Sequence, residues 1–207
     1  MPSELDRLLL EIRACRICAE RPAGKALPHE PRPVLRVREM ARIAVCGQAP
    51  GVRVHSSGIP FTDPSGDRLR AWMGVSRDEF YDEERVAIIP MGFCFPGLDH
   101  KGADLPPRPE CAPAWRARIF SLLPQLELVL LVGQFAQRWH LRSEAGRNLT
   151  ETVARWEAIL DATSPPRRIP LPHPSWRNNR WLRDNPWFEE KLLPRLRGEV
   201  RGILDRK

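Results

Sequence analysis

The sequence predicts an α/β protein, in the form of a three-layer α/β/α sandwich with a central parallel sheet of about four strands. Short apolar runs alternate along the chain with segments of helical periodicity, which is typical of a parallel sheet covered by helices on both faces. Glycine- and proline-rich polar stretches follow the apolar runs. The predicted strands are residues 43–46, 86–89, 126–132 and 168–171.

The predicted helices lie before, between and after these strands. The first carries Leu5, Leu8, Leu9 and Ile12 at the spacing of one helical face. The last should be kinked at Pro194, because proline lacks the N–H that a helix interior needs. The predicted helices are residues 3–14, 67–73, 109–123, 134–140, 149–160 and 186–204.

The length of 207 residues suits one well-buried core and is short for two. We therefore expect a single domain over residues 1–207, in which residues 1–40 form a cysteine-bearing helix and wrap and residues 185–207 a terminal helix. No stretch approaches the roughly 18 consecutive apolar residues of a membrane helix, and the first residues carry acids where a signal peptide carries bases. A cytoplasmic monomer without membrane attachment is the expectation.

The charge balance favours a polyanionic partner. Lys and Arg number 33 against 26 Asp and Glu, which gives a net charge of +7. Almost all of the cations are arginine, whose planar guanidinium suits phosphate. Neutralising phosphates in this way favours nucleic acid as a partner. The same charge would also serve solubility alone.

Five cysteines in a reducing compartment indicate metal or cluster ligation rather than disulfides. Cys15 and Cys18 form a Cys-x2-Cys pair, and sixteen residues separate Cys94 from Cys111. Cys46 lies inside the first predicted strand and is expected to be a leftover buried thiol. Four thiolates suit an iron–sulfur cluster or a zinc ion, and four unrelated buried thiols are the alternative.

Polar loops follow all four predicted strands, at residues 47–51, 91–94, 133–134 and 173–175. In parallel sheets, ligands bind beyond the carboxyl ends of the strands. These four loops should therefore converge on one site.

Two of these loops carry the motifs of a known enzyme family. Gly47-Gln-Ala-Pro-Gly51 precedes a segment that contains Phe61 and Asp63, and His173-Pro-Ser175 follows the last strand. With the four cysteines in this order and spacing, the chain resembles the uracil-DNA glycosylase superfamily, closest to its iron–sulfur families 4 and 5. The resemblance covers nearly the whole chain.

The resemblance implies a pocket for an extruded base. The backbone of Gly47, Ala49 and Gly51 would face the base, and Phe61 would stack on it. An extruded base needs such a flat apolar ring together with hydrogen bonds to its edge. His55, in the loop between the motifs, is a second polar candidate for this pocket, or else part of a flexible loop.

The resemblance also implies the catalytic groups. His173 would donate to the uracil O2, where negative charge accumulates as the glycosidic bond breaks. Families 4 and 1 place an acid in the first motif, where this chain has Gln48 and Ala49. Asp63 is then the candidate catalytic acid, as in family 5, with Gln48 near the water. An aspartate there would equally cap the helix that begins near Ser65.

The loop after the second motif is expected to bind DNA. It combines Ser175, Arg177, Asn178 and Arg180 with two tryptophans. Hydroxyls, amides and cations of this kind contact phosphates. A solvated loop anchored by its tryptophans is the alternative.

In the iron–sulfur families, an N-terminal Cys-x2-Cys pair joins two later cysteines to hold a [4Fe-4S] cluster. The resemblance therefore implies that Cys15, Cys18, Cys94 and Cys111 hold a [4Fe-4S] cluster. A structural Zn site with four thiolate ligands is the alternative.

The function that the resemblance implies is that of a monofunctional DNA glycosylase of base-excision repair, a hydrolase of N-glycosyl bonds. Its partner would be DNA containing uracil or another deaminated base. Because the first motif lacks an acid, a non-catalytic module that binds uracil in DNA is the alternative. A nucleotide-binding α/β protein unrelated to repair is disfavoured, since Gly-x-Gly-x-x-Gly and P-loop patterns are missing.

Overall fold

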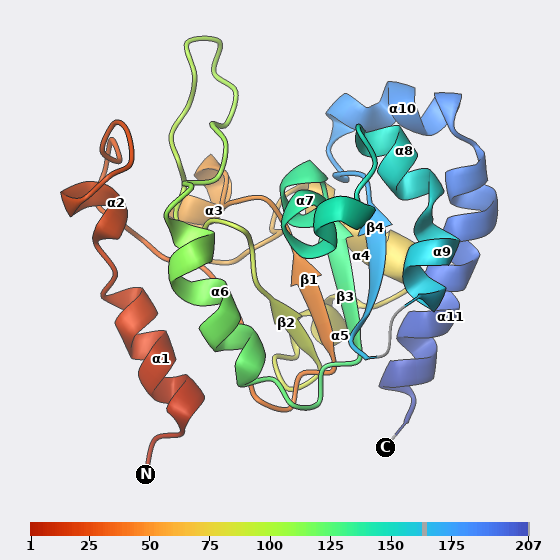
Figure 1. The fold of residues 1–207 in the computed structure, drawn as a ribbon, viewed down its shortest axis with the longest axis horizontal. Coiled ribbons are helices and arrows are strands. Elements are labelled where there is room, and N and C mark those ends of the chain that lie inside the picture. Colours follow the sequence, from red (N-terminus) through yellow and green to blue (C-terminus); the bar gives the residue numbers. More distant parts are fainter. Residues whose placement is uncertain (163–164, 207) are drawn as a thin grey trace.

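A parallel sheet lies at the centre of the protein (Figure 1). Its strands are β1 (Ile43–Cys46), β2 (Val86–Ile88), β3 (Leu128–Val132) and β4 (Arg167–Leu171). They are ordered β2-β1-β3-β4, and every pairing is parallel. This computed structural model describes residues 1–162 and 165–206. The fold class expected from the sequence is confirmed.

The strands are aligned so that their carboxyl ends share one edge of the sheet. Ile43 of β1 pairs with Val86 of β2 and with Leu128 of β3, and Leu128 pairs in turn with Arg167 of β4. The loops that follow the strands therefore emerge side by side. In Figure 1 this edge is at the top, and both chain termini lie at the opposite end.

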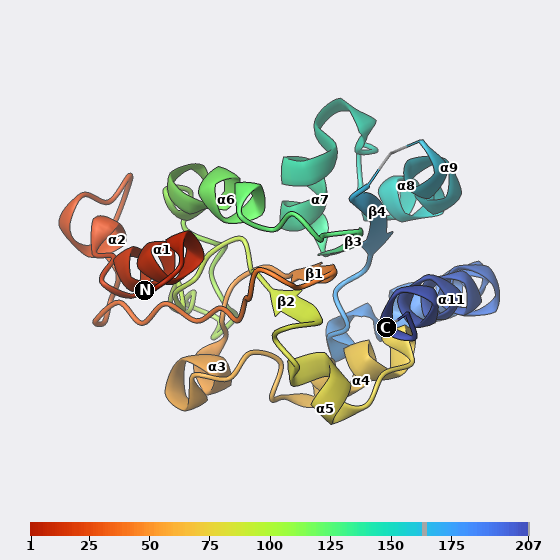
Figure 2. The ribbon, with the colours of Figure 1, turned by 90° about the horizontal axis from the view of Figure 1, so that it is seen from below.

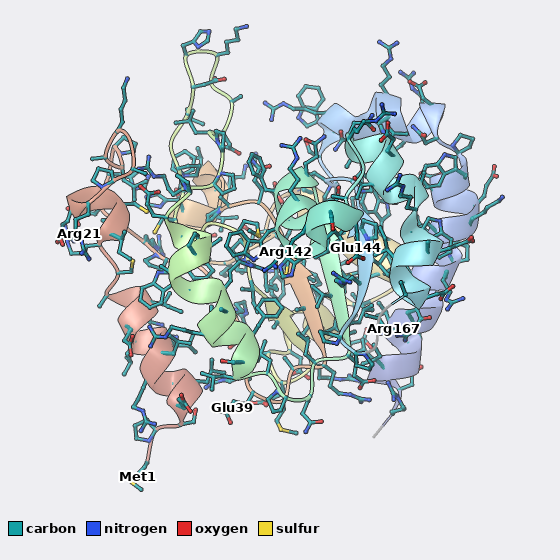
Figure 3. All side chains as sticks on the ribbon, in the orientation of Figure 1. Met1, Arg21, Glu39, Arg142, Glu144 and Arg167 are labelled. Atoms are coloured by element: carbon teal, nitrogen blue, oxygen red, sulfur yellow. The ribbon has the colours of Figure 1, made fainter. Side chains whose placement is uncertain are left out.

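Side chains alternate along the strands between two apolar cores, as the pleat requires. Ile43 and Val45 of β1 belong to one core, whereas Ala44 and Cys46 belong to the other. Figures 2 and 3 show helices on both faces of the sheet and side chains filling the space between the layers. The first core is covered by α4 (Pro64–Met73), α5 (Arg77–Tyr81) and α11 (Leu193–Leu204). The second core is covered by α1 (Glu4–Arg13), α6 (Cys111–Ser121) and α7 (Gln134–Leu141).

The two edges of the sheet are covered in different ways. At the β2 edge, Arg36 and Ile88 exchange both backbone hydrogen bonds, at N···O distances of 3.0 and 2.7 Å. At the other edge, helix α9 (Trp156–Asp161) packs on β4. Arg167, at the start of β4, pairs with Glu199 of α11 (Figure 3). Covered edges of this kind prevent pairing with another chain.

Local sequence explains where α1 begins. Ser3 and Asp6 form a capping box, in which each side chain accepts from the other residue's backbone N–H at 3.1 Å. Leu5, Leu8 and Ile12 are buried on the face turned to the core. The amphipathic helix expected at residues 3–14 is thus confirmed.

Two predicted helices are interrupted. The helix expected over 149–160 is divided into α8 (Leu149–Ala154) and α9, because Arg155 has a ψ of 13° that breaks the hydrogen-bond ladder. The C-terminal helix contains a π-helical turn, Phe188–Leu192, before α11. Pro194 therefore lies in the first turn of α11, where a backbone N–H has no partner within the helix, so proline removes no hydrogen bond. The helix is thus irregular just before Pro194, the residue at which a kink was expected.

The helices of the described residues are short, and the longest, α11, has 12 residues. None of those helices is long and apolar enough to span a membrane. Several elements were not predicted, because three to six residues carry little periodic signal. Besides α5, these are α2 (Ile17–Glu20), α3 (Val52–Ser57), α10 (Asn179–Asp184) and 3-10 turns at Arg142–Glu144 and Trp176–Asn178.

Candidate active site

A cavity of about 310 Å³ lies at the carboxyl ends of the strands. Its volume is at the lower end of the range for small-ligand pockets, which suits a single base. Seven residues predicted for the site line this cavity: Gly47, Gln48, Ala49, Gly51, Phe61, Asp63 and His173. The structure therefore brings the two sequence motifs together.

The loop after β1 is held against the loop after β2 by backbone hydrogen bonds. Met91 N–H donates to Gly47 at 2.9 Å, and Gly92 N–H donates to Gln48 at 3.0 Å. A Cβ on Gly47 would lie 3.3 Å from the Cζ of Phe61, so glycine lets the aromatic ring lie directly on the loop. The base-stacking candidate and the first motif thus form one wall.

Phe61 has an unusual backbone conformation, with a φ of 56° in the left-handed region. A non-glycine residue adopts this conformation only when its surroundings hold it. Its carbonyl oxygen accepts from Tyr81 Oη at 3.0 Å and from Arg70 Nη1 at 3.2 Å. Tyr81 Oη is also 2.7 Å from the Pro60 oxygen, and the Phe61 ring contacts Phe80 edge-on at 5.9 Å. These contacts fix the ring at the cavity wall.

The start of α4 lies against the Phe61 carbonyl. A Cβ on Gly66 would lie 1.9 Å from the Phe61 oxygen, so only glycine fits there. Asp63 caps α4, because one of its carboxylate oxygens accepts from the Gly66 N–H at 3.3 Å. Asp63 is also half-buried and lines the cavity. Capping occupies only one oxygen of this predicted catalytic acid.

His173 follows β4, and the backbone around it fixes its tautomer. The Ser175 N–H donates to Nδ1 of His173 at 3.2 Å, and the Asn178 side chain donates to the His173 carbonyl at 2.6 Å. A ring whose Nδ1 accepts carries its proton on Nε2 when neutral. Burial lowers the pKa of His173 below its ordinary value, while Asp63 opposes that shift and Arg177 adds to it. A neutral imidazole with a free Nε2–H donor results.

A second cavity of about 450 Å³ adjoins the first. Ser175, Arg177 and Asn178, three of the residues predicted to bind DNA, line it. Trp176 is 71% exposed beside them, and the Arg177 guanidinium lies 5.5 Å from its ring centroid. Arg180 lines neither cavity; it is exposed on α10 and pairs with Asp184 at 3.6 Å. The adjoining cavity is thus lined by polar side chains of the loop after β4.

The sequence model of the Uracil DNA glycosylase superfamily matches residues 36–197. The chain belongs to the uracil-DNA glycosylase superfamily. The matched segment contains both motif loops and the whole sheet. It leaves out residues 1–35, which carry Cys15 and Cys18.

His55 has a different place in this uracil-DNA glycosylase-superfamily protein from the one expected. It does not line the base cavity. Its ring lies 4.3 Å from that of His29 and 5.7 Å from that of Phe95. Burial, His29 and Arg32 lower the pKa of His55, in that order of size. The structure thus places His55 in an aromatic cluster with His29 and Phe95 rather than at the cavity.

Asp104 is a cavity residue that the sequence did not reveal. It lines both cavities, and its Oδ2 would lie 3.2 Å from a Cβ on Gly51. Partial burial of its carboxyl group raises the pKa of Asp104, which Arg177 opposes and Asp63 reinforces. Asp104 belongs to no superfamily motif quoted above; its one signal is a turn rich in Gly and Asp between β2 and α6.

The four predicted ligand cysteines gather at a separate place. Cys15, Cys18, Cys94 and Cys111 line one small cavity of about 20 Å³. Burial raises the pKa of Cys94 and of Cys111 to about 12, and the Phe93 N–H donates to Cys111 Sγ at 3.3 Å. Within residues 1–162 and 165–206, no group of three or more Cys, His, Asp or Glu side chains has the spacing of a metal-ion site.

Cys46 is the remaining thiol, buried in β1 as expected. Its Sγ accepts from Arg116 Nη2 at 3.0 Å, and Arg116 Nη1 donates to the carbonyls of Ile89 and Pro90 at 3.1 and 2.9 Å. Arg116 is 1% exposed. Arg116 therefore holds the backbone just after β2, where Pro90 lines the cavity.

We expect Gly66→Ala to destabilise the protein by about 2 kcal/mol or more, because the added methyl group collides with the Phe61 carbonyl. Gly202→Ala is the matched control, since no atom lies within 4 Å of its added Cβ in α11. That control should stabilise by roughly 0.5–1 kcal/mol through helix propensity. Urea denaturation measures both. Equal effects of the two substitutions would contradict a rigid Phe61 support.

Proposed function

We propose that this protein is a monofunctional DNA glycosylase that extrudes a deaminated base, uracil foremost, and hydrolyses its N-glycosidic bond. The observation that carries the proposal is the pairing, in one base-sized cavity, of a fixed aromatic ring at Phe61 with a neutral Nε2–H donor at His173. Superfamily membership supports the same activity. DNA that contains a deaminated base is the proposed substrate.

In this proposal, Phe61 stacks on the extruded base and the Gly47–Gly51 loop lines the base edge. As the bond to the sugar weakens, negative charge accumulates on the base. His173 then donates through Nε2–H to the developing anion. A neutral donor in a partly dry cavity stabilises that charge without first losing its own hydration.

The sugar becomes cationic as the base leaves and is captured by water. Asp63 and Gln48 both line the cavity, so either can hold that water. Because Asp63 keeps one oxygen free of its capping bond, its carboxylate remains available. Most of the rate would come from charge stabilisation, in line with the neutral state of His173.

The adjoining cavity is the proposed DNA-backbone groove. Arg177 and the side chains of Ser175 and Asn178 face it, and the net charge of +7 favours phosphate contact. Arg180, which pairs with Asp184 on α10, would contribute through the wider field of the protein.

A second candidate function is a module that binds uracil in DNA without turnover. The observation that favours it is the neutral first loop, where Gln48 and Ala49 line the cavity in place of an acid. Both functions share the cavity and the groove. They differ only in whether the glycosidic bond breaks.

We further propose that Cys15, Cys18, Cys94 and Cys111 hold a [4Fe-4S] cluster, as in families 4 and 5. The four side chains share one cavity with apolar walls, which suits a cluster held by four thiolates. A single zinc ion needs its four sulfurs within roughly 4 Å of one another, since Zn–S bonds are about 2.3 Å. Both groups would use the same four thiolates, so metal content distinguishes them. The cluster would act as a structural clamp between the N-terminal segment and the β2–α6 connection.

We expect wild-type protein to release uracil from a uracil-containing oligonucleotide, detected as strand cleavage after alkali. His173→Ala should slow single-turnover excision by about a hundredfold, the effect of losing roughly 3 kcal/mol of charge stabilisation. Its binding to undamaged DNA should change little. Full activity of His173→Ala would refute the proposed mechanism. Tight binding of uracil-DNA by wild type, with no release of any deaminated base, would establish the binding module.

The pH dependence follows from the lowered pKa of His173. The neutral ring is the active form, so excision should stay level as the pH falls from about 8 to the ordinary histidine value of 6.5, and decline only below it. Asp63 and Arg177 are the charged groups that act on this ring. A decline already complete at pH 6.5 would mean that His173 titrates at or above its ordinary value.

The purified protein should be brown and absorb at roughly 400 nm if the cysteines hold an iron–sulfur cluster. Cys111→Ser should abolish the colour. Cys46→Ala is the control, because Cys46 lies in β1 outside the cysteine cavity, and it should keep the colour. A colourless wild type with one zinc per chain would replace the cluster by zinc.

A further inference from the structure

The two cavities meet at a junction that has chemical significance. If the extruded base occupies the first cavity and the DNA backbone the second, the sugar carbon that joins them must lie between. Three ionisable residues line both cavities: Asp63, Asp104 and His173. His173 suits the base, because it would donate to the uracil O2, which lies next to the glycosidic nitrogen. The carboxylates of Asp63 and Asp104 then remain to interact with the sugar and the attacking water.

Asp104 is held at this junction by a short hairpin, the projecting light-green loop of Figure 1. Backbone bonds close the hairpin, from Leu105 N–H to Gly97 at 2.9 Å and from Asp99 N–H to Ala103 at 2.8 Å. The Asp99 carboxylate accepts from the N–H groups of Lys101 and Ala103 and so braces the turn. Asp104 itself is thereby positioned without using its own carboxylate.

The Asp104 carboxylate makes no hydrogen bond or ion pair with the described residues. It approaches the start of α3 closely, and glycine at position 51 leaves space for this approach. Asp63 differs, since one of its oxygens is committed to the cap of α4. Asp104 therefore has both oxygens available to a ligand at the junction.

The charges around the junction suit an active carboxylate. Arg53, Asp63, His173 and Arg177 are the other ionisable groups that line the two cavities. Partial burial raises the pKa of Asp104, Arg177 opposes that shift, and Asp63 adds to it. An acid placed between these influences binds a proton more readily than an ordinary surface aspartate does.

We propose that Asp104 is a second catalytic carboxylate, which holds the attacking water at the junction and accepts its proton. The inference rests on the glycosylase activity proposed above. In the step, the bond from C1′ of the sugar to the base nitrogen breaks, and its electron pair leaves with the base. The water oxygen bonds to C1′, and the proton lost by the water passes to Asp104. That proton then returns to solvent or to the base anion.

Single-turnover excision of uracil tests this role. Asp104→Asn should slow the reaction by about a hundredfold, as for loss of a general base, while the Kd for uracil-DNA stays within about twofold. Asp63→Asn keeps an acceptor for the α4 cap and should cost less than Asp104→Asn. Asp78→Asn is the control, since Asp78 is exposed on α5 and lines neither cavity. Its rate should match wild type.

Chemical rescue separates catalysis from hairpin support. Asp104→Ala opens space at the junction, so added formate should restore its rate by about tenfold or more, and should leave Asp78→Asn unaffected. Wild-type speed in Asp104→Asn would overturn the proposal. So would a slow Asp104→Ala that formate does not restore, because that marks a structural role. If wild type itself releases no base, the proposed function fails first, and the role of Asp104 fails with it.

Discussion

Because β1, β3 and β4 run parallel and in register, the loops after them have to share one edge of the sheet. Gly47 and His173, from opposite ends of the sheet sequence, thereby line one cavity. A Cβ on Gly133, after β3, would lie 3.8 Å from the Cβ of His173, after β4. The loop after β1 bonds directly to the loop after β2. The site is therefore assembled by strand register.

Burial shifts the pKa values of His173 and Asp104, the two ionisable groups that matter most, in opposite directions. Burial lowers the pKa of His173 and raises the pKa of Asp104. The histidine becomes a neutral donor, and the aspartate becomes a better proton acceptor. Both effects have the same physical origin, the poor solvation of charge in a partly dry cavity. In the proposed mechanism, this one feature of the fold prepares an electrostatic donor and a base.

Strand positions were predictable from sequence because buried parallel strands are continuous apolar runs. The base cavity was predictable because its residues lie in two short motifs at strand ends. Asp104 was not, since a hairpin residue carries no periodic signal and only the fold brings it close to Gly51 at the cavity. His55 misled for a related reason: closeness in sequence to the first motif says little about direction in a loop. His55 lies within the short helix α3, which directs it toward His29 and Phe95.

The support of Phe61 acts on its backbone carbonyl, which Tyr81 and Arg70 hold and Gly66 approaches. None of these contacts depends on which ring the residue carries. The backbone conformation and the chemical identity of the stacking side chain are therefore separable properties. Another ring at position 61 would keep the same turn, whereas its contacts with Gly47 and Phe80 would change. In the proposed glycosylase, divergence toward other damaged bases would therefore require compensating changes at those two contacts.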